Sequence, residues 1–82
     1  MNTEESIYEN GRKQPLRTWP QLMHRKVGPR LIEELENSYP DFEFEIMTVF
    51  EKSRAKNNQA DSRRVRIYTD LDGVVVEIPR NG

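Results

Sequence analysis

The sequence predicts an α+β fold: a single small domain with one helix packed on a small mixed sheet, and a long exposed loop joining two parallel strands. Residues 27–38 carry apolar side chains at helical spacing, and residues 42–50 and 65–69 alternate between apolar and polar side chains as strands do. Residues 51–64 are too many for a tight hairpin between those strands. A parallel pair with a long connection fits better.

Composition narrows the classes of protein that the chain can represent. Its 82 residues are 34% apolar and 33% charged, which allows one modest core. The absence of cysteine excludes disulfides and thiolate metal ligands, and a net charge of −1 lacks the basic excess of a nucleic-acid binder. The longest apolar run, 74–76, is too short for a membrane span or a signal-peptide core. We therefore expect no membrane partner and, unless a precursor segment is missing, a cytoplasmic protein.

The first part of the chain contains a tail and then the main core residue. Residues 1–17 are polar and show no period, which predicts a disordered N-terminal tail before a folded domain at 18–82. Trp19 is the only tryptophan, and Pro20 holds it in an extended conformation. We expect Trp19 to anchor the core rather than to bind a ligand.

The helix is predicted over residues 27–38. Its apolar stripe consists of Val27, Leu31, Ile32 and Leu35. Gly28 can cap the helix, and Pro29 suits its first turn, where an N–H would have no partner. Asn37, Ser38 and Pro40 end it.

Three strands complete the predicted domain. The apolar face of the first is formed by Phe42, Phe44, Ile46, Thr48 and Phe50, and that of the second by Val65, Ile67 and Thr69. Residues 70–73 form a turn in which Gly73 can adopt a positive φ, and residues 74–78 form the third strand.

The connection 51–64 is the candidate functional element. It has no Gly or Pro, half of its residues are charged, and a connection of this length is either functional or a solvated linker. Its basic residues could meet phosphates, but it offers no aromatic side chain for base stacking. His24 is the only histidine, and no catalytic set, phosphate loop or metal site is evident, so we expect neither an enzyme nor a cofactor.

Four segments together resemble the potato inhibitor I family of serine-protease inhibitors. They read WPQL at 19–22, YPDF at 39–42, RVRIY at 64–68 and VEIPRNG at 76–82, and the likeness covers residues 18–82. The resemblance implies a helix-and-sheet wedge whose loop, here 51–64, occupies the active site of a serine protease as a substrate would.

The resemblance also assigns roles to single residues. It implies that the protease-binding loop contains Lys52, Ser53, Arg54, Ala55, Lys56, Asn57, Asn58 and Gln59. It further implies that Arg64, with Arg63 and Arg66, braces this loop. Asp61 stands where members of the family usually carry another arginine, and the loop is longer than is usual for the family.

The reactive bond has two candidate positions. Counting from Met47 puts it near Arg54 or Ala55, and counting back from Val65 puts it near Asn58 or Gln59. Arg54 and Lys56 would suit a trypsin-like or subtilisin-like protease with an acidic primary pocket, although solvated charges on a loop are the ordinary state of exposed Lys and Arg.

Two functions are consistent with this sequence. One is inhibition of a serine protease by the loop, and the other is a non-inhibitory protein-interaction domain that keeps the scaffold with a remodelled loop. In either case we expect a monomer with a protein partner.

Overall fold

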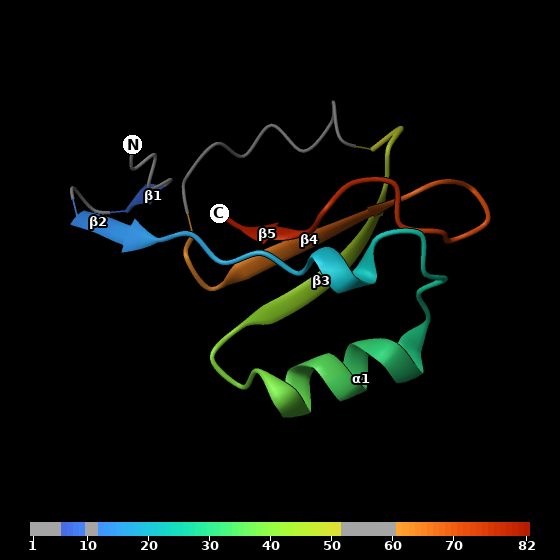
Figure 1. Cartoon of the computed structure of the whole chain (residues 1–82), viewed down its shortest axis with the longest axis horizontal. Coiled ribbons are helices and arrows are strands. Elements are labelled where there is room, and N and C mark those ends of the chain that lie inside the picture. Colours follow the sequence, from blue (N-terminus) through green and yellow to red (C-terminus); the bar gives the residue numbers. More distant parts are fainter. Residues whose placement is uncertain (1–5, 10–11, 52–60) are drawn as a thin grey trace.

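The computed structural model describes residues 6–9, 12–51 and 61–82, and all structural statements below refer to them. Figure 1 shows the order of the elements along the chain. They are β1 (Ser6–Glu9), β2 (Arg12–Pro15), a 3-10 turn η1 (Pro20–Leu22), α1 (Pro29–Ser38), β3 (Glu43–Thr48), β4 (Arg64–Thr69) and β5 (Arg80–Asn81). No described helix is long and apolar enough to cross a membrane.

The main sheet contains the parallel pair that the long connection predicted. Its strand order is β3-β4-β5, with β3 parallel to β4 and β4 antiparallel to β5. The parallel register pairs Glu43 with Arg64 and Thr48 with Thr69. Apolar residues of α1 pack on one face of this sheet, so the predicted α+β fold with a mixed sheet is confirmed.

Trp19 lies at the centre of the core with 1% of its surface exposed. Its ring makes edge-on contacts with Tyr39, Phe42 and Phe44 at centroid distances of 5.5, 5.2 and 5.3 Å. Aromatic pairs favour this geometry because the positive ring edge meets the negative ring face. The largest apolar side chain therefore joins the end of the helix to the start of β3.

The helix begins as the sequence predicted. Gly28 is the N-cap in an extended conformation, and Pro29 occupies the first helical position. Leu35 is buried, while Leu31 and Ile32 are partly buried against the core. Helical residues 29–38 differ from the predicted range only at its first turn.

Two strand predictions need correction. The third strand was expected at 74–78, but β5 is Arg80–Asn81, and Val74 and Val75 form only isolated bridges. The Val76 N–H still donates to Tyr68 on β4 at 3.1 Å, but the Pro79 carbonyl accepts the N–H of Trp19, beside η1, at 2.9 Å, so the segment is shared between two neighbours and forms no continuous ladder with β4.

The predicted apolar face of the first strand is also only partly buried. Phe44 is buried, but Ile46 is 41% and Phe50 66% exposed. Figure 1 shows the reason: β3 rises away from α1 toward its C-terminal end, so the helix covers only its beginning. Phe50 lies beyond the end of the strand.

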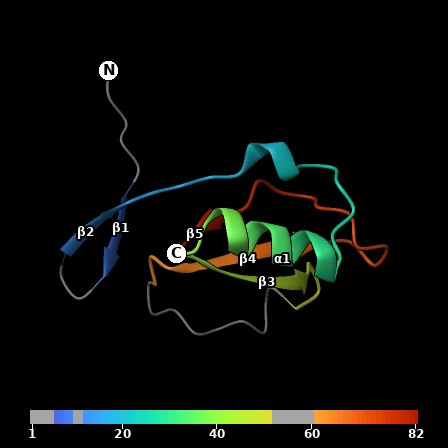
Figure 2. The ribbon, with the colours of Figure 1, turned by 90° about the horizontal axis from the view of Figure 1, so that it is seen from below.

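The N-terminal segment contains a strand pair that the sequence did not predict. β1 and β2 pair antiparallel, from Ser6 opposite Pro15 to Glu9 opposite Arg12, and project from one end of the domain (Figures 1 and 2). The pairing needs only backbone N–H and carbonyl groups, so it leaves no apolar period in the sequence. The proposed boundary at residue 18 remains a prediction.

Candidate functional site

The candidate site is defined by the two ends of the long connection. The predicted loop residues 52–59 lie outside the described residues. Because β3 and β4 are parallel, the chain leaves the sheet at one end and must re-enter it at the other. What the described residues show is how firmly each end is held.

The leading end is closed by a tight turn between Thr48 and Glu51. The Glu51 carboxylate accepts the backbone N–H of Thr48 at 2.9 Å and its hydroxyl at 3.0 Å. The Glu51 N–H donates in return to the Thr48 carbonyl at 3.0 Å, and the Val49 N–H donates to Thr69 on β4 at 2.9 Å. These four bonds fix the direction in which the chain leaves β3.

The trailing end is closed by a turn at Asp61. Its side-chain carboxylate accepts the N–H of Arg63 at 2.9 Å, and its backbone carbonyl accepts the N–H of Arg64 at 3.1 Å. The Arg63 carbonyl accepts the N–H of Glu43 at 2.7 Å, which ties the turn to β3. An Asp at the first position of such a turn is favoured because its side chain can bond the backbone two residues on.

The C-terminal residues hold the same trailing end from β5. Asn81 is 3% exposed, and its side-chain N–H groups donate to the carbonyls of Ser62 at 2.8 Å and Pro15 at 3.3 Å. Gly82 donates its N–H to the Arg64 carbonyl at 2.9 Å and accepts the Arg64 Nε–H at 3.2 Å.

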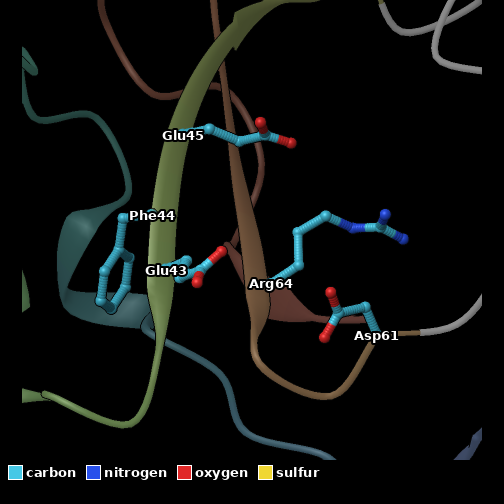
Figure 3. Close-up of a pocket in the computed structure, with 5 residues that line it drawn as sticks. All are labelled: Glu43, Phe44, Glu45, Asp61 and Arg64. Carbon is cyan, nitrogen blue, oxygen red and sulfur yellow. The ribbon is translucent and has the colours of Figure 1, made fainter.

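The sheet face opposite the core carries charged side chains beside this turn. Figure 3 shows Phe44 on the core side of β3, with Glu43, Glu45, Arg64 and Asp61 on the other side. These five residues line an open pocket of about 180 Å³. The pairing of Glu43 with Arg64 in the register places opposite charges on adjacent strands.

The three predicted bracing arginines occupy different environments. Arg66 donates its Nε–H to Glu45 at 3.0 Å across the strands, whereas Arg64 donates to Gly82. The Arg63 side chain is exposed, although its backbone is part of the Asp61 turn. The structure thus brings Arg64 and Arg66 onto one face of the sheet beside the Asp61 turn. Arg63 lies in the turn itself, before the start of β4. Their bracing role is untested.

The protonation of Arg66 follows from its contacts. Burial acts to lower the pKa of its guanidinium, but the hydrogen bonds and negative charge of Glu45 and Tyr68 outweigh it and raise the pKa above its ordinary value. Arg66 therefore stays charged.

Asn81 is the site residue that sequence reasoning missed. Its partners lie 19 residues away at Ser62 and up to 66 residues away at Pro15, so no local pattern could mark it. The residues around it give no signal either, because Glu77 and Arg80 in the same segment are also polar.

The described residues were compared with the arrangements that metal binding and catalysis need. They contain no group of three or more His, Asp and Glu side chains that could hold a metal. His24 is exposed on a turn before the helix. The arrangement fixes residues 48–51 and 61–64, the two ends of the connection between β3 and β4, by hydrogen bonds, which defines a small scaffold that holds both ends of one long connection.

Comparison with known proteins agrees with this class of scaffold. One of the 17 solved chains that this chain resembles is bitter gourd trypsin inhibitor, with 25% sequence identity and a TM-score of 0.64. The match covers 79% of this chain and 90% of that one. No family model and no curated protein sequence matches the chain. The chain therefore has the fold of a small protease inhibitor.

Proposed function

We propose that this protein inhibits a serine protease through residues 51–64, as a member of the potato inhibitor I type. The observation that carries the proposal is the parallel pair β3–β4, whose connection is hydrogen-bonded to the sheet at both ends. The fold shared with a trypsin inhibitor supports it.

The held ends matter because an inhibitory loop must be ordered before it binds. If about six loop residues had to be ordered on binding, at about 1 kcal/mol each, about 6 kcal/mol would be lost. That loss corresponds to about four powers of ten in dissociation constant. A braced loop thus binds tightly where a loose loop is only a substrate.

The trailing turn has a further part in the proposed mechanism. When the enzyme's serine attacks a loop peptide bond, the chain after the bond becomes the leaving segment. Here that segment continues into the Asp61 turn, in which the Arg63 carbonyl accepts the N–H of Glu43 on β3 and the Ser62 carbonyl accepts the side-chain N–H of Asn81 on β5. A leaving amine that stays near the acyl-enzyme favours religation over hydrolysis.

The target class follows from which loop residue enters the primary pocket. Arg54 or Lys56 would select a protease with an acidic pocket, of the trypsin-like or the subtilisin-like type. If the bond lies near Asn58 or Gln59, a protease with a polar or unselective pocket would be the target.

Incubation with trypsin, chymotrypsin and subtilisin tests the proposal directly. We expect stoichiometric inhibition of at least one enzyme and slow cleavage at a single bond within 51–64, located by mass spectrometry. Arg54→Ala and Lys56→Ala form a matched pair, because only the residue in the primary pocket should be needed against trypsin. Fast cleavage at several loop bonds without inhibition would overturn the proposal.

Two observations favour the second candidate, a non-inhibitory interaction domain on the same scaffold. The Nε–H of Arg66 is bonded to Glu45 on the neighbouring strand, and Asp61 stands where an arginine was expected. A loop with fewer bracing cations would suit a partner that does not cleave it. In that case the loop is cleaved rapidly by trypsin, and no protease is inhibited.

A further inference from the structure

Two independent contacts attach the N-terminal segment to the domain. In the first, the backbone N–H of Arg17 donates to the side-chain oxygen of Asn81 at 2.7 Å, and the Asn81 N–H donates back to the Arg17 carbonyl at 3.2 Å. The Asn81 side chain also donates to Pro15 at 3.3 Å. Residues 15–17 are therefore bonded to β5.

The second contact is made by the Arg17 side chain. Its guanidinium carbon lies 5.9 Å from the ring centroids of Trp19 and Tyr39 and 5.5 Å from that of Phe42. A cation within about 6 Å of an aromatic ring face is attracted by the ring's negative potential. The Arg17 guanidinium thus makes cation–π contacts with three aromatic rings, and these contacts hold residue 17 against the core.

The Asn81 carboxamide joins this attachment to the candidate loop. Its nitrogen donates to Pro15 and to Ser62, and its oxygen accepts from Arg17. Ser62 belongs to the turn that ends the long connection. One buried side chain therefore bridges the N-terminal segment and the trailing end of the loop.

We propose that Asn81 is a positioning residue that makes residues 15–17 part of the loop's support. Its effect on inhibition rests on the proposed function, whereas its effect on the loop end does not. Without the carboxamide, the carbonyl of Ser62 loses its Asn81 donor, and the side-chain link between the turn at Asp61 and residues 15–17 is lost, while the backbone bonds of Asn81 and Gly82 remain. The turn then opens more often than the strands around it.

Amide hydrogen exchange on the full chain tests this link. In Asn81→Ala, we expect exchange at Arg63 and Arg64 to accelerate roughly tenfold more than exchange at Ile67, as for the loss of one hydrogen bond. Arg80→Ala is the matched control, because Arg80 is the exposed neighbour on β5. Equal acceleration at all three amides would mean that Asn81 is merely structural and would overturn the proposal.

A second pair of variants probes the N-terminal side and leaves Asn81 in place. Arg17→Pro removes the N–H that bonds Asn81 and also the guanidinium, whereas Arg17→Ala removes only the guanidinium. We expect Arg17→Pro to accelerate exchange at Arg63 and Arg64 several-fold beyond Arg17→Ala. If the two variants exchange alike at these amides, residues 15–17 do not support the loop.

The inhibitory readout separates this proposal from the proposed function. Against a protease that the parent chain inhibits, Asn81→Ala should bind about tenfold more weakly and be cleaved faster within 51–64, at temperatures where it stays folded. If the parent chain inhibits no protease, the proposed function fails, and the exchange measurements still decide whether Asn81 positions the loop end.

Discussion

Glu45 and Arg66 form an ion pair between the two parallel strands, with the Arg66 Nε 3.0 Å from the Glu45 carboxylate. The two residues are partners in the strand register, so the geometry of the sheet alone brings them together. The pair lies on the face of the sheet opposite the core, and Arg66 is one of the cations expected to brace the loop.

The first prediction concerns the energy of this pair. Half of the Glu45 side chain is exposed, so solvent screens the interaction, and a double-mutant cycle with Glu45→Gln and Arg66→Gln should give a coupling of about 0.2–1 kcal/mol. Urea unfolding at low and high salt measures it, and salt should reduce it. A coupling well above this range would mean that the pair is effectively buried.

The pH dependence of the pair follows from the sign of the Arg66 shift. A folded-state pKa above the unfolded value gives a contribution that is fully present below the unfolded pKa and is lost only as the pH rises through the folded pKa. Both pKa values lie in the strongly alkaline range, because a guanidinium stays charged throughout the ordinary pH range. Arg66 deprotonation should therefore not weaken the fold in neutral or mildly alkaline buffer.

The second prediction compares two adjacent arginines at the loop end. Arg64→Ala removes a charged donor to the Gly82 carbonyl, whereas Arg63→Ala removes an exposed side chain. If Arg64 braces the loop, its loss should weaken protease inhibition about tenfold, the effect of one charge-assisted hydrogen bond. Arg63→Ala should change it little. Inhibition constants and cleavage rates measure both, and equal effects would remove Arg64 from the proposed brace.

Much of the fold could be predicted because its signals are local or depend on chain length. Gly28 and Pro29 mark the start of the helix by their own backbone preferences. The parallel pairing followed from the length of 51–64, which excludes a tight hairpin. The positive φ of Gly73, at 82°, was likewise predicted from the turn in which it lies.

The rest depended on contacts between distant segments. The alternation at Ile46 and Phe50 indicated a buried face but could not show where the helix stops covering it. The role of Asn81 could not be recognised from the sequence, because its side chain forms hydrogen bonds with three residues of other segments. The resemblance suggested which arginines to consider, yet only the register shows that Arg66 faces Glu45.

The third prediction concerns the turn between β4 and Val74. The Asp70 carboxylate accepts the N–H groups of Asp72 and Val74, both at 2.9 Å. Asp70→Ala leaves both donors without this partner and should lower the free energy of unfolding by about 1–2 kcal/mol. Asp72→Ala is the control, because the Asp72 side chain is exposed and its N–H is retained. Similar losses in the two variants would contradict this account.

The fourth prediction uses backbone strain at His24. Its φ is 69°, a left-handed conformation that L-residues with a Cβ adopt at a cost and glycine adopts freely. His24→Gly should therefore raise the free energy of unfolding by about 1 kcal/mol. For a domain of this size, that raises the melting temperature by roughly 4–8 °C.

His24→Ala separates relief of strain from loss of the imidazole. Alanine keeps the Cβ, so this variant should not be stabilised, and both variants retain the His24 N–H that donates to Val75 at 3.0 Å. Because His24 is exposed, little packing is lost in either variant. Thermal unfolding of the pair decides the matter: if alanine stabilises as much as glycine, the gain comes from removing the imidazole and the backbone at this position is not strained.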